Sequence, residues 1–391
     1  MNKRKICVFV GSRANYSSIK SVIRAVKEHP QLQLQLVIGA SAVLDRFGKV
    51  EDLIRADGFE PDFSFYNIVE GENPVTMAKS TGLGLIEAAM VFDNLKPDYL
   101  VVVGDRFEMM SVTIAAAYMN IRIAHTMGGE VTGTIDESIR HAISKFAHVH
   151  FAASADAQQR ILKLGEDPEF VYNVGCPRMD LVLEELQNNS MEVLKDLFTN
   201  FSGVGPASMD LSKPFLLVSQ HPVTTEFGNN RKQIEETLYA LDELQMPTIM
   251  LWPNIDAGSD DIATGIRVYR EIYNRDSAKW LKLFKNLPTK MYIHLMNSCA
   301  CLIGNSSSGV REGATIGTPV VNIGTRQHKR EMGQNVINTP YNRHQIKEAI
   351  LKQIEHGKYN RADIYGSGNA GKKIADILAT ANPAIQKTIT Y

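Results

Sequence analysis

Short runs of β-branched and apolar residues alternate with amphipathic stretches along almost the whole chain, and this alternation restricts the fold more than any other feature. The run Tyr99–Gly104 is apolar at nearly every position, as expected for a strand buried on both faces of a parallel sheet. The stretch Ser17–Glu28 repeats its apolar residues at the period of a helix with one buried face. Such alternation predicts an α/β fold built on parallel sheets.

Two series of these elements follow one another along the chain. In the first, strands are predicted at Lys5–Val10, Leu32–Gly39, Tyr99–Gly104, Ile121–Ala124 and Val149–Ala153, and helices at Ser17–Glu28, Thr76–Leu95, Phe107–Met119, Asp136–Phe146 and Ala155–Leu164. In the second, strands are predicted at Phe215–Ser219, Thr248–Trp252, Ala300–Ile303 and Pro319–Ile323, and helices at Arg231–Leu244, Ile262–Asn274, Pro288–Asn297 and Ser308–Ile316. Two further helices, Arg343–His356 and Gly371–Ala381, close the chain.

The domain boundaries follow from a cluster of turn-forming residues between the two series. Residues 188–214 contain Asn-Asn-Ser, Ser-Gly-Val-Gly-Pro and Lys-Pro, which is typical of a connection between domains. A chain of 391 residues also exceeds what one hydrophobic core usually spans. We therefore predict two doubly wound domains at 1–187 and 214–368, a linker at 188–213, and a C-terminal helix within 369–391.

Composition excludes several classes of protein. The chain has 42 basic and 43 acidic side chains and is 44% hydrophobic, whereas disorder requires low hydrophobicity and high net charge. The balanced charge offers no electrostatic basis for binding nucleic acid or a membrane surface, and no uninterrupted apolar run approaches the roughly 20 residues of a membrane-spanning helix. The N-terminal apolar run is too short for a signal peptide, and four scattered cysteines suit a reducing compartment. We expect a cytoplasmic protein without nucleic-acid or membrane partners, and without a metal, because Cys299-x-Cys301 is too closely spaced for a zinc site.

Ligands of open parallel sheets bind outside the carboxyl ends of the strands, so the loops after strands are the candidate sites. Gly11–Ser18 follows the first strand and offers a glycine for a tight turn, Arg13 for an anion, and hydroxyls that can cap the next helix. It lacks the G-x-G-x-x-G pattern, which disfavours a nicotinamide cofactor. An ordinary turn with Arg13 in solvent accounts equally well for this loop.

The loop Gly304–Glu312 predicts an anion site in the second series. Ser306 and Ser307 stand where a strand turns into a helix, so their hydroxyls and the free backbone N–H groups can converge on one anion. A serine cap without a ligand is the alternative. Glu312 could accept both hydroxyls of a ribose or be an exposed helix charge, and Arg326 after the next strand could add a cation.

Three further positions carry groups that can transfer protons. Asp105 and Arg106 follow the most apolar strand, where they either pair with each other or serve a ligand. Asp136 precedes a helix and is either its cap or a catalytic carboxylate. His221 follows the strand Phe215–Ser219; such a histidine is usually structural or on the surface, but this one lies at the ligand end of a strand.

Together these motifs resemble the hydrolysing UDP-N-acetylglucosamine 2-epimerase family, whose members produce N-acetylmannosamine in the sialic acid pathway. Nine segments match in order and spacing: Gly11–Ala14, Gly104–Phe107, Gly128–Asp136, Ser138–Ile143, Gln220–Thr225, Pro253–Ser259, Gly304–Ser307, Val310–Glu312 and Gly324–Gln327. The resemblance implies two Rossmann-like domains that face each other across a cleft, as in GT-B glycosyltransferases, with C-terminal helices that return to the first domain. It also implies a homodimer or homotetramer.

The resemblance further implies a reaction and its residues. UDP leaves C1 as the C2 proton is removed, water adds to the resulting 2-acetamidoglucal, and the products are N-acetylmannosamine and UDP, without nicotinamide or pyridoxal. By resemblance, Asp105 and Asp136 are the acid/base carboxylates, and His221 belongs to both the catalytic and the nucleotide sites. The residues matching the UDP site are Arg13, Ala14, Ser17, Arg106, His221, Asn254, Ser306, Ser307, Arg326 and, for the ribose, Glu312.

One position departs from the family pattern. Most members have an acidic residue immediately before Gly-Gly-Glu, where this chain has Met127, and a thioether cannot transfer a proton. Three explanations remain open. Glu130 replaces the missing carboxylate, or Asp105 and Asp136 suffice together with His125, or Met127 packs on a less polar substituent of a different sugar.

Three other functions compete with hydrolysis of UDP-N-acetylglucosamine. The same reaction could act on a UDP- or GDP-linked 2,4-diacetamido-2,4,6-trideoxyhexose. A glycosyltransferase of the same architecture would pass the sugar to an acceptor. A non-catalytic regulator would bind the nucleotide sugar after losing catalysis with the carboxylate at Met127. The matches at Asp105 and Asp136 favour the epimerase.

Overall fold

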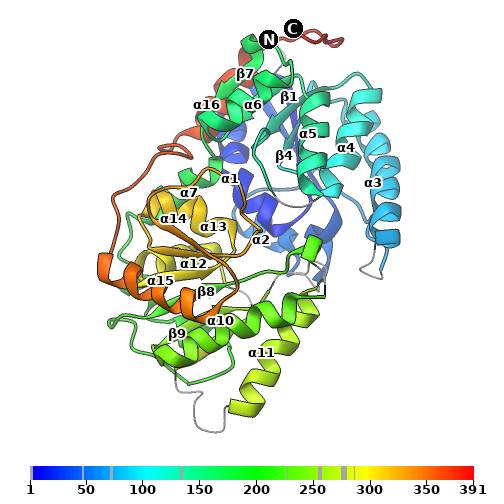
Figure 1. Cartoon of the computed structure of the whole chain (residues 1–391). Helices are drawn as coiled ribbons and strands as arrows, with labels where there is room; N and C mark the ends of the chain where they lie inside the picture. Colours follow the sequence, from blue (N-terminus) through cyan, green and yellow to red (C-terminus); the bar gives the residue numbers. More distant parts are fainter. Residues whose placement is uncertain are drawn as a thin grey trace. The chain divides into compact units, whose positions relative to one another are not determined.

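The computed structural model describes residues 3–45, 48–70, 74–132, 135–226, 228–253, 258–273, 280–285 and 287–391. Its contacts divide the chain into two compact units. Unit 1 comprises Met1–Val131, Ile135–Leu181 and Tyr365–Tyr391, and unit 2 comprises Thr132–Thr134 and Val182–Ile364. Each unit is a parallel sheet covered by helices (Figure 1), so the predicted pair of doubly wound α/β domains is confirmed.

Unit 1 is built on a seven-stranded sheet of order β3-β2-β1-β4-β5-β6-β7, and every pairing in it is parallel. Its strands are β1 (Arg4–Val10), β2 (Leu32–Ile38), β3 (Phe63–Ser64), β4 (Tyr99–Val103), β5 (Arg122–Thr126), β6 (Val149–Ala152) and β7 (Val171–Asn173). The strand order reverses between β1 and β4. Ligands of such sheets bind at the carboxyl ends of the strands on either side of this reversal.

The helices of unit 1 bury the apolar faces of this sheet. They are α1 (Arg13–Glu28), α2 (Val50–Ala56), α3 (Pro74–Leu95), α4 (Phe107–Tyr118), α5 (Asp136–Phe146), α6 (Ala155–Lys163) and α16 (Ala370–Thr380). On one face, Leu100 and Val102 of β4 pack with Phe92 of α3 and Val112 of α4. Each such side chain contributes about 1.5–3 kcal/mol when fully buried. This packing holds the end of β4 at a defined place in the sheet.

The C-terminal helix belongs to unit 1. α16 packs against α1 so closely that a Cβ on Gly371 would lie 2.6 Å from the backbone of Ser21. The carboxylate of Asp180 accepts hydrogen bonds from the backbone N–H groups of Ala370 and Gly371, at 3.0 and 2.8 Å. These bonds satisfy two donors that a helix N-terminus leaves free.

Unit 2 repeats the same architecture with six parallel strands in the order β10-β9-β8-β11-β12-β13. Its strands are β8 (Leu216–Ser219), β9 (Thr248–Leu251), β10 (Leu281–Phe284), β11 (Cys301–Gly304), β12 (Val320–Ile323) and β13 (Val336–Thr339). Its main helices are α10 (Asn230–Leu244), α11 (Ser259–Tyr273), α12 (Thr289–Ser298), α13 (Ser307–Val310), α14 (Glu312–Ile316) and α15 (Arg343–His356). Here the strand order reverses between β8 and β11.

The segment 188–213, predicted as a linker, is instead part of unit 2. It forms α8 (Ser190–Leu194) and α9 (Leu197–Asn200), whose residues Leu194 and Leu197 are buried. Val204 pairs with the backbone of Leu283 in β10 through hydrogen bonds of 2.8 and 2.9 Å. The apolar residues between the turn formers anchor this segment in unit 2. The boundary between the two units instead falls within α7 (Pro177–Glu185), and the chain returns to unit 1 between Ile364 and Tyr365.

Other differences from the sequence prediction are local. The helix predicted at Ser308–Ile316 is two short helices, α13 and α14, with a break at Arg311, where ψ is −72°. β7, β10 and β13 were not predicted, because strands of three or four residues with polar members carry little periodic signal. α5 and α15 coincide with their predicted ranges.

α3 has one packed face and one exposed face. Within the described part of the chain, its segment Val75–Leu95 alone is long and apolar enough by length and composition to cross a membrane, with a mean hydropathy of 1.2. The sequence shows no uninterrupted run there because Lys79, Glu87 and Asp93 divide it. Core helices of soluble proteins pass the same test, and α3 does bury Ala88, Val91 and Phe92 against the sheet.

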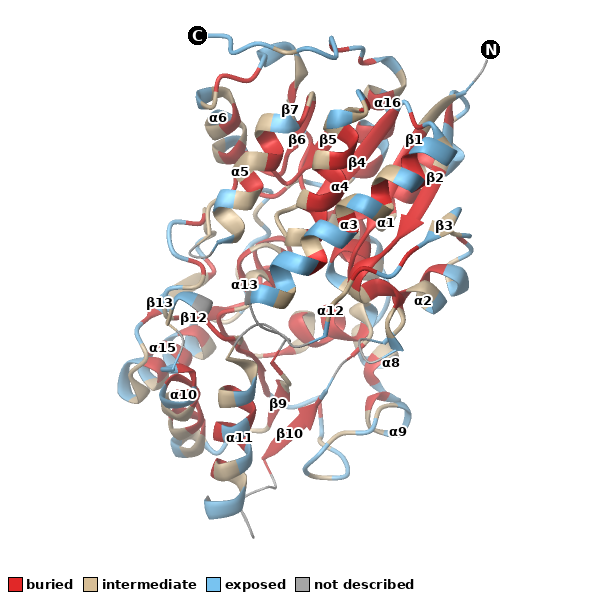
Figure 2. Cartoon of the chain, turned by 90° about the vertical axis from the view of Figure 1, so that its right-hand side faces the viewer, coloured by how far each residue is buried: buried red, intermediate tan, exposed pale blue. Residues whose placement is uncertain are grey.

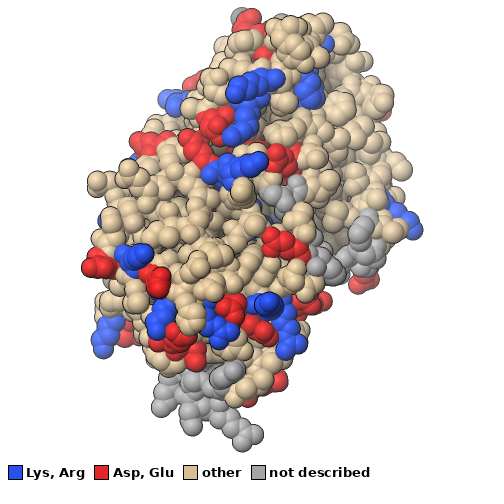
Figure 3. Space-filling view, in the orientation of Figure 1, with Lys and Arg blue, Asp and Glu red and all other residues tan. Residues whose placement is uncertain are grey.

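Charged side chains of both signs are interspersed over the face of the molecule drawn in Figure 3. This distribution matches the near equality of acidic and basic residues in the sequence. It is typical of a solvated surface.

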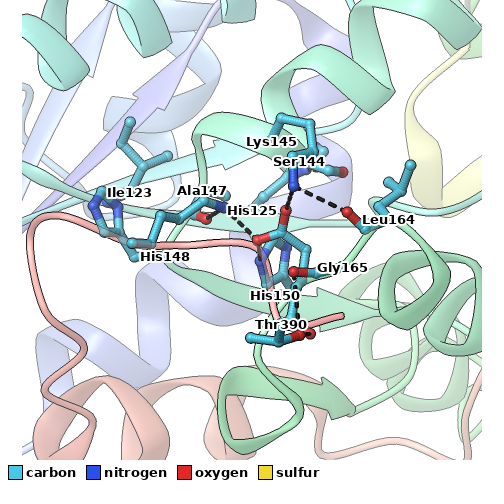
Figure 4. A network of polar contacts seen from close by, with 12 residues as sticks. Ile123, His125, Ser144, Lys145, Ala147, His148, His150, Leu164, Gly165 and Thr390 are labelled. Atoms are coloured by element: carbon cyan, nitrogen blue, oxygen red, sulfur yellow. Dashed lines mark hydrogen bonds and ion pairs between the residues drawn. The ribbon is translucent and has the colours of Figure 1, made fainter.

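The last residues of the chain are held on unit 1 by a buried carboxylate. Glu166, 3% exposed, accepts hydrogen bonds from Lys145 Nζ at 2.5 Å, from His150 Nε2 at 3.1 Å, and from Lys387 Nζ. Thr390 donates its backbone N–H to the carbonyl of Gly165 at 3.2 Å. Lys145, His150, Gly165 and Thr390 gather in one network in Figure 4. Burial alone would raise the pKa of Glu166, but the hydrogen bonds from His150, Lys145 and Lys387 outweigh burial and lower this pKa to about 2.

Lys387→Met should destabilise unit 1. The substitution removes one of three charge-assisted hydrogen bonds to a buried carboxylate, which costs about 1–3 kcal/mol. Thermal unfolding at pH 7 measures the effect, with Lys372→Met on an exposed position of α16 as the matched control. Equal stability of the two variants would show that the contact between Lys387 and Glu166 does not stabilise unit 1.

Candidate active site

A buried guanidinium holds Asp105 in place. It follows β4 directly, in a turn started by Gly104, whose φ of +73° favours glycine. Its carboxylate forms an ion pair with Nη2 of Arg140 on α5. Arg140 is 1% exposed and also donates from Nη1 to the carbonyl of Glu130 at 2.8 Å. A buried guanidinium requires anionic or carbonyl partners, and Asp105 and Glu130 supply them.

Asp136 lies on the same face of α5 as Arg140. It is the half-buried first residue of the helix, one turn before Arg140, and residues four apart on a helix are neighbours. The free N–H groups at a helix N-terminus also favour a carboxylate. The structure therefore joins Asp105 to Arg140, and α5 carries Asp136 one turn before the same arginine. Sequence reasoning did not single out Arg140, and its position one turn after Asp136 was the available signal.

Arg106 does not pair with its neighbour Asp105, which was one of the two predicted alternatives. It pairs with Glu108. Its Nε lies 3.0 Å from Oε1 of Glu108 in the first turn of α4, while Asp105 is bound to Arg140. Glu108 is buried beneath the first loop, since a Cβ on Gly11 would lie 2.5 Å from its Cγ. The ends of β1 and β4 therefore meet at the Arg106–Glu108 ion pair, where the strand order of the sheet reverses.

The first loop of unit 1 presents a helix N-terminus. Ser12 caps α1 by accepting a hydrogen bond from the backbone N–H of Asn15 at 3.2 Å, so the capping hydroxyl is not that of Ser17. Arg13 and Ala14 are the first two residues of α1, where backbone N–H groups have no helical partner. Arg13 is half-buried, so its side chain is not simply in solvent, and this burial lowers its pKa.

Met127 is packed within unit 1. It is 5% exposed, its φ is +64°, and its Sδ lies 3.9 Å from Sγ of Cys176. The following turn is tightly restricted, because a Cβ on Gly129 would lie 2.2 Å from the carbonyl oxygen of Ala157. At the position of the family's acidic residue, this chain therefore places an apolar side chain against another sulfur. Glu130 is also buried, and its role as the substitute carboxylate stays a prediction.

His125 positions the turn of Asp105. Its Nε2 lies 2.8 Å from the carbonyl oxygen of Gly104, and its Nδ1 lies 3.1 Å from Oγ of Ser144. Because a carbonyl can only accept, Nε2 carries the proton and Nδ1 accepts from the serine hydroxyl. Burial lowers the pKa of His125 to about 3, despite the opposing effect of the Gly104 carbonyl. His125 is therefore neutral near pH 7 and holds the peptide before Asp105, which argues against the alternative that it helps to transfer protons.

In unit 2, Asn305 connects the loops that follow β8, β11 and β12. Its side chain accepts from the backbone N–H of His221 at 2.7 Å and donates to the carbonyl of His221 at 2.8 Å. Its own carbonyl accepts from Arg326 Nη1 at 3.3 Å and from Gln327 Nε2 at 2.9 Å. The structure thus brings together His221 and Arg326, which the sequence separates by about a hundred residues. Asn305, 1% exposed, was not among the predicted site residues.

The predicted serines form the start of α13. Ser306 caps the helix by accepting from the backbone N–H of Ser308 at 3.4 Å, and Ser307 is its first residue. Ser308, the third serine of this loop, shares short hydrogen bonds with Ser306 at 2.8 Å and with Tyr292 at 2.7 Å. Burial raises the pKa of Tyr292 to about 12, against the opposing effect of the hydroxyls of Ser308 and Ser219, so the phenol stays protonated near pH 7.

Glu312 is 4% exposed at the start of α14, so it is not an exposed helix charge. Asn254 lies outside the described residues, and the prediction for it rests on the resemblance alone. Each unit therefore has a helix N-terminus with an arginine in the same loop region or the next one. One is at the start of α1 with Arg13, and the other is at the start of α13 with Arg326.

The sequence profile of the UDP-N-acetylglucosamine 2-epimerase family matches residues 24–379. The chain belongs to this family. It is 30% identical to the UDP-N,N'-diacetylbacillosamine 2-epimerase (hydrolyzing) of Legionella pneumophila, over 96% of both chains. It is 32% identical to the GDP/UDP-N,N'-diacetylbacillosamine 2-epimerase (hydrolyzing) of Campylobacter jejuni, over 88% of this chain and 86% of the relative. It is 27% identical to the UDP-N-acetylglucosamine 2-epimerase of Neisseria meningitidis, over 94% and 92%.

Solved structures of the same family share the fold. The Neisseria meningitidis UDP-GlcNAc 2-epimerase bound to UDP-GlcNAc aligns with a TM-score of 0.81 at 17% identity, covering 96% of this chain and all of the other. The Methanocaldococcus jannaschii enzyme in complex with UDP-GlcNAc and UDP aligns with a TM-score of 0.78 at 18% identity, covering 96% and 100%. At these identities the likeness shows the GT-B-like fold of two parallel-sheet domains.

The buried neutral state of His125 predicts acid sensitivity of unit 1. The folded pKa of His125 is about 3 against an ordinary value of 6.5, so below pH 6.5 the unfolded chain binds one more proton than the folded chain. The free energy of unfolding should therefore fall by about 1.4 kcal/mol per pH unit between about 6.5 and 3 through this residue. Urea unfolding at several pH values measures the slope. His125→Asn should flatten it, and His356→Asn on the exposed end of α15 should not.

Proposed function

We propose that this protein is a hydrolysing 2-epimerase that converts UDP-N-acetylglucosamine and water into N-acetylmannosamine and UDP. The observations that support the proposal are the ion pair between Asp105 and the buried Arg140, and the position of Asp136 one turn before Arg140 on α5. Elimination breaks the C2–H bond and the C1–O bond to UDP and forms the double bond of a 2-acetamidoglucal. Addition of water then places a hydroxyl on C1 and a proton on C2 from the opposite face.

Inversion at C2 requires proton transfer on both faces of the sugar. A single group cannot remove a proton from one face and return one to the other, so two acid/base groups are needed at close range. Asp105 and Asp136 are proposed as this pair. Met127 cannot take part, and neutral His125 serves to hold the turn of Asp105.

The leaving group determines how readily the first step proceeds, since the C2 proton is only weakly acidic. Donors aimed at the departing diphosphate stabilise the charge that develops on it. We assign this task in unit 2 to the N-terminus of α13 with Ser306 and Ser307, and to Arg326, which Asn305 holds beside His221. Glu312 is assigned to the ribose, and Arg13, Ala14, Ser17 and Arg106 in unit 1 stay predicted nucleotide contacts.

A 2,4-diacetamido-2,4,6-trideoxyhexose linked to UDP or GDP is the second candidate substrate. The relatives in Legionella pneumophila and Campylobacter jejuni, which are named for N,N'-diacetylbacillosamine, favour it. Met127 is buried against Cys176, so this residue does not distinguish between the two sugars. We also place the protein in the cytoplasm, in keeping with its four free cysteines.

Incubation in heavy water with each nucleotide sugar in turn tests the reaction and the substrate together. UDP-N-acetylglucosamine should yield free UDP and N-acetylmannosamine that carries deuterium at C2, as measured by mass spectrometry and NMR. Faster turnover of the diacetamido sugar would select the second candidate. Both nucleotide sugars remaining intact would contradict an epimerase, and release of sugar only with an acceptor would indicate a glycosyltransferase.

Asp105→Asn and Asp136→Asn should each lower turnover by about 10²–10⁴-fold, because each removes one acid/base group. UDP affinity, measured by calorimetry, should stay within a factor of a few, since the assigned diphosphate donors lie in unit 2. Asp376→Asn on α16 is the control. If both active-site variants kept the wild-type rate, the role of the two carboxylates would be wrong.

A further inference from the structure

A chain of hydroxyl groups lies behind the loop of Ser306 in unit 2. Most of α12 is buried (Figure 2), and Tyr292 on this helix is 9% exposed. Its phenol oxygen lies 2.7 Å from Oγ of Ser308, which in turn lies 2.8 Å from Oγ of Ser306. The phenol is also hydrogen-bonded to the side chain of Ser219 at the end of β8. Tyr292 therefore joins the end of β8 to the loop after β11, where the strand order reverses.

The backbone donors of this loop are largely bound within the protein. The N–H groups of Asn305 and Ser306 both donate to the carbonyl of Ser219 at 3.2 Å. The N–H of Ser308 donates to Oγ of Ser306 at 3.4 Å, and the N–H of Gly309 donates to the carbonyl of Ser306 at 3.2 Å. An anion that binds here therefore relies on hydroxyl hydrogens, among them that of the half-buried Ser306.

The number of available hydrogens determines the direction of the chain. Each hydroxyl has one hydrogen to donate, and its oxygen can accept others. A diphosphate only accepts, so Ser306 has to give it its single hydrogen and cannot donate to Ser308. The bond between the two serines then requires the hydrogen of Ser308, and the bond between Ser308 and Tyr292 requires the hydrogen of the phenol. Binding of an anion by Ser306 therefore specifies every donor back to Tyr292.

We propose that Tyr292 is a positioning residue for the leaving diphosphate, because it donates to Ser308 and so directs the hydroxyl of Ser306 toward the ligand. The inference rests on the proposed function, which places a diphosphate at Ser306. The phenol stays protonated near pH 7, since burial raises its pKa to about 12, so it has a hydrogen to donate. Its oxygen can accept from Ser219 at the same time, so the required direction leaves the phenol fully bonded.

The phenol matters because the two serine hydroxyls can otherwise exchange their roles. Without a donor behind Ser308, the hydroxyl of Ser306 can turn inward and donate to it, which removes this hydrogen from the ligand. Donors that are oriented before charge develops on the leaving group need no reorganisation during the reaction. Hydrogen bonds in a chain also polarise one another. The effect of the phenol should therefore be confined to ligands that carry the diphosphate.

A purely structural tyrosine is the alternative, since buried phenol groups usually find a hydrogen-bond partner. The two roles differ in the ligands that they affect. Positioning of Ser306 concerns the diphosphate and not the nucleoside, whereas a disturbed fold would weaken the binding of both. Tyr292→Phe separates the roles, because it keeps the packed ring and removes only the hydroxyl.

Calorimetry with UDP and ligand-observed NMR with uridine test the positioning role in the full-length protein. Tyr292→Phe should weaken UDP binding about three- to tenfold, as expected for one net hydrogen bond, and leave uridine binding unchanged. Tyr269→Phe on α11 is the matched control and should change neither, because it removes the hydroxyl of another buried tyrosine of unit 2. Unchanged UDP affinity of Tyr292→Phe would overturn the proposal, and so would an equal loss for both ligands.

A double-variant cycle tests whether Tyr292 acts through Ser308. Ser308→Ala should also weaken UDP binding about three- to tenfold, because it breaks the chain at the next hydroxyl. The double variant should bind UDP as weakly as Ser308→Ala alone, since the phenol then has no serine to orient. Losses that multiply in the double variant would overturn the chain.

These measurements distinguish a failure of the inference from a failure of the proposed function. A wild type that binds no UDP would contradict both. A wild type that binds UDP but turns over neither nucleotide sugar would contradict the proposed reaction alone, because the binding measurements would still decide the role of Tyr292.

Discussion

The ion pair between Arg140 and Asp105 is the interaction on which the candidate active site depends. Arg140 is almost completely buried, and a guanidinium in that position is stable only if its partners stay in place. It binds the carboxylate of Asp105 at the end of β4 and the carbonyl of Glu130 beyond β5, and it shares one face of α5 with Asp136. One cation therefore determines where three segments of unit 1 meet.

In both units, buried polar side chains hold the neighbouring functional groups in place by forming hydrogen bonds with the backbone. In unit 1, neutral His125 holds the carbonyl of Gly104 and so fixes the turn that presents Asp105. In unit 2, the amide of Asn305 fixes the loop of His221, while its carbonyl receives Arg326. In each case a buried polar side chain positions a functional group by binding the main chain beside it. Such side chains are rigid because every alternative would leave a polar group unsatisfied.

Met127 shows how far a motif can be interpreted without a structure. The sequence reveals that an acidic residue is replaced, but it leaves open whether the methionine faces the sugar or the protein interior. In the structure its sulfur contacts Cys176, at a backbone conformation unusual for a methionine. The predicted linker is a similar case. Turn formers identified a boundary region, yet Leu194 and Leu197 bury this segment in unit 2.

The sequence by itself determined the alternation of strands and helices, the two parallel sheets and the loops that carry Asp105, Asp136, Ser306 and Arg326. These features are encoded locally, in the period of apolar residues and in the turn chemistry after each strand. The tertiary structure alone decided that Asp105 pairs with Arg140 and not Arg106, that Asn305 joins His221 to Arg326, and that α3 keeps an apolar face exposed. Each of these depends on which distant segments become neighbours, and a pairing over a long sequence separation leaves no periodic signal in one chain.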